Sequence, residues 1–522
     1  MYILPNSNLH ILRNVPLDTG YEHTIYFANP TAQYTYFNSL AKFRRQKYSY
    51  LRPNENVIRV DILSDDLYDC NYIMFQNTSF GNRWFYAYIR SVNMVNNKTS
   101  EITFDLDVIQ TWFFDFTLDT CFVERTHTQT DVIGEHIEPE SVEVGEYVMN
   151  SYEEITSLTK MDVIVGICDV DEGADGRVYD GIFSGAQLWA FKDTDFTGIN
   201  DKINRYAQNP DAVTIMYICP NRLIYGDDGD PPDGGILIPY TVMGREFTYT
   251  PANGSVKPTD FLDGYKPRNN KMYTYPYCYY HVDNGNGSNL ALRYEFFTGG
   301  QVKVKIGGTI VQPVQVILNP MNYKAWQGAA GMVNKNETLS LNNYPMCSWN
   351  MDSYKAWVAQ NSVPMAINTV TGGLGMIAQM ASGNLVGGAL TGVNMIGNLL
   401  SQNYQASIAA DIHKGSANSA NVNVSLRELT FWGGRASITA EYAKCIDDYF
   451  TLYGYGLKRL MKPVLNARPH WTYIKTVDAT ITGSVPCDDM KRIIEIFDSG
   501  ITVWMHGAEV GHYELNNSPV AG

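Results

Sequence analysis

A long stretch without any charged residue constrains this chain more than any other feature of its sequence. Asp, Glu, Lys, Arg and His are all absent between Lys355 and Asp411, although charged residues make up 18% of the chain. Residues 365–400 are rich in Gly, Ala, Met and Leu, and Asn, Gln, Thr or Ser recurs every few residues. Such a composition favours either burial inside protein or contact with lipid.

A lone transmembrane helix needs about 20 predominantly apolar residues, and the amides and glycines here make a single crossing marginal. Several packed copies change that balance, because neighbours satisfy the amides and small residues allow close approach. The stretch is also long enough for a hairpin with two crossings. One interpretation is therefore a membrane-active loop over residues 351–425; the other is a buried pair of core helices or an uncharged linker.

The membrane interpretation predicts two sets of functional residues. The glycines that would allow close packing are Gly372, Gly373, Gly375, Gly383, Gly387, Gly388 and Gly392, which include two G-x-x-x-G spacings. The side chains that would enter lipid are Met365, Ile367, Val370, Leu374, Met376, Ile377, Met380, Leu385, Val386, Leu390, Val393, Met395, Ile396, Leu399 and Leu400.

The remainder of the chain predicts a mainly β, multidomain protein with a few helices. A length of 522 residues suits three or four domains, and the 36 tyrosines favour strands. Arg83–Ile89 and the alternating run Ile102–Val108 flank turn residues at Asn96 and Asn97, which predicts an antiparallel hairpin. Short apolar strands at Met161–Ile167 and Val213–Ile218 lie in a block of Gly- and Asp-rich loops, interpreted as an inserted domain.

Further elements are expected towards the C-terminus. Alternation at Val302, Val304 and Ile306 and along Trp471–Thr482 predicts strands. Ser437–Tyr453 reads as an amphipathic helix that ends near Gly454, and a second helix is expected from a cap at Asp488 to Gly500.

No catalytic, cofactor or metal site is predicted. Gly373-x-Gly375-x-x-Ala378 matches a dinucleotide fingerprint, but no acidic residue follows before Asp411. The acidic loops at Asp169–Gly176 and Asp228–Asp230 lack the closing Glu of a calcium-binding EF-hand, so a solvated loop is expected, with an irregular cation site as the alternative. The nine histidines form no metal-binding motif, and the eight cysteines form no C-x-x-C pair, which favours buried, reduced thiols.

The net charge of −15 argues against a compact nucleic-acid reader, which would need a basic stripe. The N-terminal residues show neither the basic region nor the apolar core of a signal peptide, so synthesis in a cytoplasm is expected.

Several long aromatic motifs resemble the distal tail knob, or tail tube, proteins of phi29-like small podoviruses of Gram-positive bacteria. The motifs are Tyr72–Asn77, Gly81–Ala87, Phe104–Trp112, Tyr275–Cys278, Ala440–Tyr442, Tyr453–Tyr455 and Ile496–Trp504. They bracket most of the chain, and the uncharged stretch falls where that family carries a long hydrophobic loop. The block from Ser151 to Pro267 matches poorly.

The resemblance implies a fold and a function. It implies tail-tube-like barrel domains that form a tube of six copies at the distal tip of the virion tail, below other tail proteins. The six hydrophobic loops would plug the lumen and, once released, penetrate the host cytoplasmic membrane as a channel for genome ejection. DNA would pass without sequence-specific binding. The implied domains are 1–147 and 268–350 (β-rich tube), 148–267 (inserted), 351–425 (the loop) and 426–522 (an α+β segment completing the tube).

Two other functions stay open. A receptor-binding or wall-binding tail component without pore activity would present an exposed aromatic groove, expected in the Ser151–Pro267 block. A wall-degrading enzyme would need a pair of carboxylates, and the sequence singles out none.

Overall fold

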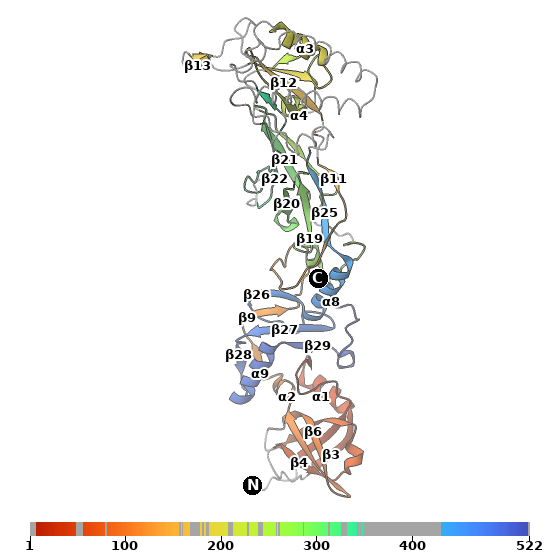
Figure 1. Ribbon diagram of the computed structural model, residues 1–522. Coiled ribbons are helices and arrows are strands. Elements are labelled where there is room, and N and C mark those ends of the chain that lie inside the picture. The colour runs from red at the N-terminus through yellow and green to blue at the C-terminus, as the bar shows by residue number, and fades with distance from the viewer. Residues whose placement is uncertain are drawn as a thin grey trace, which may run out of the picture. The chain divides into compact units, whose positions relative to one another are not determined.

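The computed structural model describes residues 7–48, 56–78, 81–155, 158, 160–167, 178–179, 182–183, 187–206, 212–226, 229–238, 244–256, 258, 262–285, 287–311, 314–324, 331–341, 344, 346–348 and 430–519. The fold is mainly β with a few helices, as the sequence predicts (Figure 1). The chain forms two compact units. Unit 1 comprises Met1–Glu146, Asp260–Thr274 and Ile438–Gly522, and unit 2 comprises Tyr147–Thr259 and Tyr275–Ser437. The five-domain division expected from the sequence stays a prediction.

Unit 1 begins with a six-stranded antiparallel sheet. Its strands, in spatial order, are β3 (Ala41–Tyr48), β1 (Ser7–Arg13), β5 (Cys70–Asn77), β6 (Trp84–Asn96), β7 (Thr99–Leu106) and β4 (Val57–Val60). The sheet curls until its edges meet: Arg45 Nε on β3 lies 3.0 Å from the Asp61 carboxylate just beyond β4, and the Asp61 N–H donates to the Tyr48 hydroxyl. Side-chain contacts thus close the sheet in a barrel-like way.

Strand alternation places a different core on each face of this sheet. One face buries Leu9, Ile11, Ile73 and Ile102 inside the curl. The opposite face carries Leu12, Tyr72, Met74, Tyr86 and Tyr88 into the main core of unit 1. That core also contains residues of α1 (Pro30–Ser39), α2 (Val108–Trp112) and α9 (Cys487–Ser499).

A second, five-stranded sheet completes unit 1. Its order is β2 (His23–Ile25), β29 (Ile501–Trp504), β27 (Trp471–Val477), β9 (Cys121–Thr126) and β26 (Tyr455–Met461). β2 and β29 run parallel, and the other recorded pairs are antiparallel. The smaller elements of unit 1 are β8 (Phe116–Leu118) paired with β28 (Ile481–Gly483), α8 (Ala440–Tyr453), and the 3-10 helices η1 (Ser64–Leu67), η4 (Asn270–Tyr273) and η6 (Gly507–Glu509).

Unit 2 contains three larger sheets and a short hairpin. The first is β10 (Tyr147–Met149), β25 (Trp432–Ile438), β19 (Cys278–Asp283) and β20 (Asn289–Leu292), with β11 (Glu153–Glu154) also on β25. The second is β17 (Ile236–Leu237), β15 (Gln187–Lys192), β12 (Met161–Ile167), β16 (Val213–Pro220) and β24 (Met346–Ser348). The third sheet is β18 (Phe247–Tyr249), β21 (Lys303–Thr309), β22 (Gln315–Met321) and β23 (Leu339–Leu341). The short hairpin consists of β13 (Val178–Tyr179) and β14 (Ile182–Phe183). The helices α3 (Phe196–Arg205), α4 (Asn221–Tyr225) and η5 (Tyr294–Phe296) also belong to unit 2.

The strands predicted at residues 161–167, 213–218 and 302–306 are confirmed as β12, β16 and β21, and the predicted hairpin as β6 and β7. One end of the hairpin was predicted wrongly. Val108 is the first residue of α2 rather than the end of a strand, because the Asp107 carboxylate accepts the Gln110 N–H and caps that helix.

Both C-terminal helices are confirmed as α8 and α9. The predicted start of α8 at Ser437 is wrong because Ser437 and Ile438 belong to β25, and the predicted cap of α9 is also wrong. Pro486 occupies the cap position, and Asp488 lies in the first turn. The expected strand Trp471–Thr482 is in fact two strands, β27 and β28. Asp478 between them adopts φ +51°, and the Asp498 carboxylate accepts the Ala479 N–H there, so the extended chain is interrupted.

Candidate functional site

The functional residues predicted from the sequence all lie outside the described residues. The hydrophobic loop at 351–425, with its lipid-facing side chains from Met365 to Leu400 and its glycines from Gly372 to Gly392, falls within residues 349–429. Within the described ranges, no helix is both long and apolar enough to cross a membrane.

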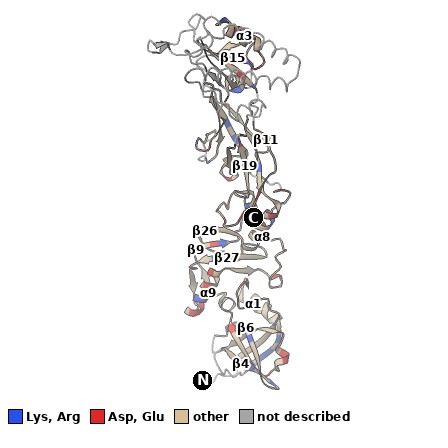
Figure 2. Cartoon of the chain, viewed as in Figure 1, with Lys and Arg blue, Asp and Glu red and all other residues tan. Residues whose placement is uncertain are grey.

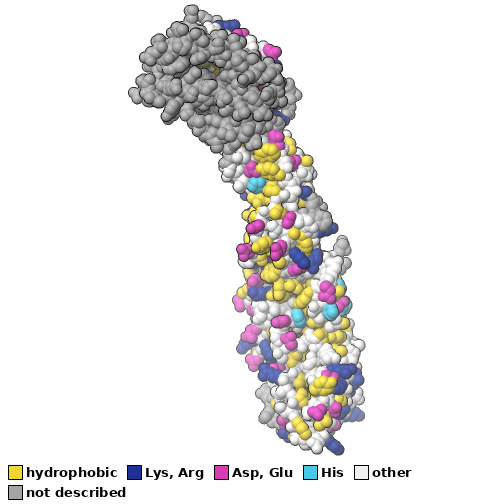
Figure 3. Space-filling view, turned by 45° about the vertical axis from the view of Figure 1, so that its right-hand side comes forward, with side chains coloured by type: hydrophobic (Ala, Val, Ile, Leu, Met, Phe, Trp, Pro, Cys, Tyr) yellow, Lys and Arg dark blue, Asp and Glu magenta, His cyan; other side chains and the backbone are white. Residues whose placement is uncertain are grey.

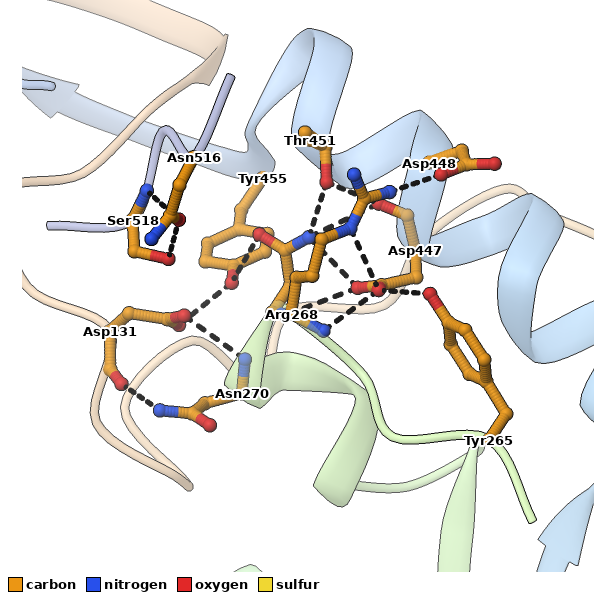
Figure 4. Close-up of polar contacts among 11 residues, drawn as sticks. Asp131, Tyr265, Arg268, Asn270, Asp447, Asp448, Thr451, Tyr455, Asn516 and Ser518 are labelled. Atoms are coloured by element: carbon orange, nitrogen blue, oxygen red, sulfur yellow. Dashed lines mark hydrogen bonds and ion pairs between the residues drawn. The ribbon is translucent and has the colours of Figure 1, made fainter. Parts of the chain in front are cut away.

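The described residues contain instead a buried polar site that sequence reasoning missed. Residues 262–274 return to unit 1 between two excursions of the chain into unit 2. Four consecutive residues of this return segment, Arg268 to Lys271, contact four carboxylates of unit 1, shown in part in Figure 4. We call these carboxylates, Asp131, Glu140, Asp447 and Asp448, the carboxylate clamp.

Asp447 of α8 is the centre of the carboxylate clamp. Its fully buried carboxylate accepts hydrogen bonds from the Arg268 N–H at 2.8 Å, the Asn269 N–H at 3.0 Å, the Asn269 side-chain amide at 2.8 Å and the Tyr265 hydroxyl at 2.7 Å. The neighbouring Asp448 forms an ion pair with the Arg268 guanidinium. Hydrogen bonds that a charged acceptor receives are the stronger kind, so the return segment is held firmly.

Asp131 and Glu140 hold the other end of the four-residue run. Asp131 accepts the Asn270 N–H at 3.0 Å and the Tyr455 hydroxyl at 2.7 Å. Glu140 accepts from Lys271 Nζ at 2.6 Å and from the Gly456 N–H at 2.8 Å, and also pairs with Arg125. Burial alone would raise the pKa of Glu140, but these partners outweigh it and hold the pKa below its usual value.

The position of Asp447 follows from helix periodicity. α8 buries Ala443, Ile446, Asp447 and Phe450, so a carboxylate stands on the apolar stripe of an amphipathic helix. An acidic residue at a core position of such a stripe is the signal that could have identified the carboxylate clamp. The segment that it binds is polar and irregular, and its sequence offers no comparable signal.

This arrangement supports anchoring rather than chemistry. The Asp447 oxygens are already occupied by donors, whereas a catalytic acid or base needs access to a substrate proton. No group of three or more His, Cys, Asp or Glu suited to a metal occurs in the part of the chain that the structure describes.

The histidines have mainly structural surroundings. His127 is buried; its Nδ1 accepts the Tyr473 N–H, and its Nε2 lies 3.1 Å from the Thr451 carbonyl oxygen. Burial, together with the Arg468 and Arg125 cations, lowers the pKa of His127 to about 3. His136 is also buried, whereas His506 and His512 are exposed.

The acidic loops and the cysteines agree only in part with the sequence interpretation. Asp169–Gly176 and Asp228 lie outside the described residues, and Asp230 pairs with Lys160. Four described cysteines, Cys70, Cys121, Cys219 and Cys278, are free and buried, as expected. Cys445 and Cys487 are free but exposed, because each occupies the solvent side of a helix.

Two protein-family models match this chain. The model of the C-terminal domain of the tail knob protein gp9 of Bacillus phage phi29 matches residues 246–518. The model of the N-terminus of the caudoviral major tail protein matches residues 5–117, which contain the curled six-stranded sheet.

Whole-length relatives are similar as well. The chain is 24% identical to the tail knob protein gp9 of Bacillus phage B103 and 23% identical to that of phage phi29, over 98% of this chain and 99% of each relative. The solved structure of the bacteriophage C1 tail knob protein gp12 superposes with a TM-score of 0.61 at 13% identity, covering 97% of this chain and 98% of that one. At that identity, the superposition shows a shared fold.

Proposed function

Since the chain belongs to the family of the phi29 tail knob protein gp9 and is a structural protein of the virion tail, we propose that six copies form a knob tube whose uncharged loops plug the lumen and, on release, penetrate the host cytoplasmic membrane. The released loops then form a channel in that membrane, through which the genome enters. No catalytic step is assigned to the chain.

The uncharged stretch is the observation that carries this proposal. Residues 356–410 contain no Asp, Glu, Lys, Arg or His, in a chain in which 18% of residues are charged. Each apolar side chain that enters lipid contributes roughly 0.8 kcal/mol per buried CH₂, and six loops multiply that gain. Packing the same loops inside a lumen already buries part of this apolar surface, so the free energy of release is the difference between two buried states.

The described residues support the tube half of the proposal. The N-terminal curled sheet lies in the region similar to a major tail protein, and the carboxylate clamp fixes the segment that joins the two excursions of the chain into unit 2. A net charge of −15 favours DNA sliding over DNA binding, since binding comes from Lys and Arg that neutralise phosphates.

Dye release from anionic liposomes tests the membrane half. We compare the intact protein with a variant in which residues 365–400 are replaced by a Gly/Ser linker of equal length, and measure the particle mass of both. The proposal expects leakage from the intact protein alone, with both forms assembling alike.

A charge placed within the stretch gives a finer test. Leu390→Asp is expected to reduce leakage severalfold, because a carboxylate at a membrane centre costs about 3 kcal/mol. Val311→Asp is the matched control, since Val311 is 57% exposed on unit 2, and its leakage should equal that of the intact protein. Equal leakage from all forms, or none from the intact protein, would contradict the membrane role and favour a wall-binding tail component.

A further inference from the structure

The five-stranded sheet of unit 1 carries opposite charge on its two edges. β26 forms one edge and β2 the other. From Tyr455 to Val477, which includes β26, the sequence has five Lys or Arg and no Asp or Glu. The stretches 14–40 and 499–519, which include β2 and its neighbour β29, have four Asp or Glu and no Lys or Arg. Figure 2 colours Lys and Arg blue and Asp and Glu red on the ribbon, where β26 is labelled beside β9 and β27.

The charged groups at both edges are available for contact. Lys458, Arg459 and Lys462 are exposed, and no ion pair is recorded for them among the described residues. At the other edge Glu22 is exposed and likewise has no recorded ion pair within the described ranges. Glu514, 72% exposed, pairs only with His512 there, and the adjacent Tyr513 contacts His23 of β2.

An exposed apolar row adjoins the basic edge. Leu460 on β26 lies opposite Phe122 on β9, and Phe122 lies opposite Val477 on β27. Their exposed fractions are 73%, 37% and 46%. Figure 3 shows how such hydrophobic side chains lie among charged ones on the described surface.

Edge protection alone does not account for these features. A bulge with Lys458 at φ +48° and its charged neighbours would be enough to prevent strand pairing at β26. Protection does not require three exposed hydrophobic side chains in register, nor an opposite charge on the far edge. An apolar row rimmed by charge is typical of a protein–protein contact.

The acidic edge would make its contacts through side chains. The Gln110 side-chain amide donates to the Ile25 carbonyl at 2.8 Å and to the Thr24 hydroxyl at 2.9 Å, so part of the β2 backbone is already occupied. Arg492 of α9 lies 5.9 Å from the ring of Tyr21 and is a cation near this edge. The acidic groups of Glu22 and Glu514 nevertheless remain at the surface.

We infer that the basic edge of one copy, residues 458–462 with the apolar row, docks against the acidic edge of the next copy around Glu22 and Glu514. The two edges lie on opposite sides of one sheet, so the contact is head-to-tail. Repeating it gives a ring where the rotation between copies closes, rather than a two-fold dimer. The inference rests on the proposed tube and assigns the surfaces that build it. Complementary charge sets the register of such a contact and accelerates its formation.

A charge-swap experiment tests the inference. The first variant is Lys458→Glu with Arg459→Glu, the second is Glu22→Lys with Glu514→Lys, and the third combines all four changes. Asp18 is left unchanged because its carboxylate holds the Gly20 N–H in a turn. Each pair alone should weaken subunit association on the order of 100-fold, and the combination should restore it.

The readouts are native mass spectrometry and sedimentation, with circular dichroism to verify folding. Lys491→Glu is the matched control; its side chain is 75% exposed on α9, which is not a strand of this sheet, and its assembly should match that of the unchanged protein.

Each other outcome has a defined meaning. If the unchanged protein stays monomeric, the proposed tube itself fails. If it assembles and either charge-reversed pair assembles equally well, or if the combination does not restore a lost assembly, the edges do not meet and the inference is wrong. The same holds if Lys458→Glu with Arg459→Glu abolishes binding of duplex DNA while assembly is unchanged, because the basic edge would then bind phosphate.

Discussion

At the scale of single residues, Asp447 shows how one buried charge organises a polar segment. It accepts four hydrogen bonds from Tyr265, Arg268 and Asn269 while fully buried on α8. Asp447→Asn removes the charge and turns one acceptor into a donor that faces other donors. We expect a loss of about 3 kcal/mol, typical of breaking a buried charged network.

Hydrogen exchange of peptides 262–274 and 440–453 measures this loss locally. Asp448→Asn is the control, because that carboxylate is half-exposed and pairs with the same Arg268; less than about 1 kcal/mol is expected there. Equal protection in the two variants would show that Asp447 does not carry the anchoring.

His127 makes the stability of unit 1 depend on pH. Its pKa is about 3 in the folded chain against an ordinary 6.5, so the unfolded chain takes up the proton first. The contribution of neutral His127 to the free energy of unfolding is therefore complete above pH 6.5. It decreases as the pH falls towards 3, by about 1.4 kcal/mol per pH unit.

Urea unfolding between pH 7.5 and pH 5 measures this slope while most carboxylates stay ionised. His127→Gln keeps one donor and one acceptor and should reduce the slope, while His10, whose pKa is lowered by burial to about 4, retains its own share. An unchanged slope in that variant would assign the pH dependence to other groups.

At the scale of elements, the junction between α8 and β26 requires glycine. Gly454 adopts φ +66°, and a Cβ there would lie 2.4 Å from the Thr126 carbonyl carbon and 2.5 Å from the His127 nitrogen. Gly454→Ala should therefore cost roughly 3 kcal/mol, because β9 and β26 would have to separate. Thermal unfolding checks this value against Gly264→Ala, where φ is +84° but nothing lies within 4 Å and only about 1 kcal/mol is expected. Similar losses at both sites would refute the steric argument.

Elements with strong periodicity were predictable, and their ends were less so. The α8 stripe, the alternation in β7 and the short apolar run of β12 identified those elements from sequence alone. The break at Asp478 depends on a hydrogen bond between Ala479 and the distant Asp498. The cap at Asp107 depends on a hydrogen bond with Gln110 that the strand-like alternation does not indicate. The carboxylate clamp was missed for the same reason, since it joins residues as far apart as Asp131 and Asn270.

At the scale of the whole molecule, neither unit is formed by one continuous stretch of the sequence. Unit 1 is assembled from three separate stretches and unit 2 from two. Sequence patterns are local, so they identified the strand β27 but neither β9 and β29 nor the sheet that these three strands share. The family resemblance supplied the tail-knob assignment that periodicity could not.

Because unit 1 is built from three separate stretches of the chain, its folding depends on the order of translation. A growing chain emerges from the ribosome N-terminus first, and β26, β27 and β29 are encoded after residue 454. The sheet that carries both charged edges therefore cannot form until residues 356–410 have been translated. Truncated products that lack the uncharged stretch and everything after it also lack β26, β27 and β29, so translation order itself excludes them from the proposed ring.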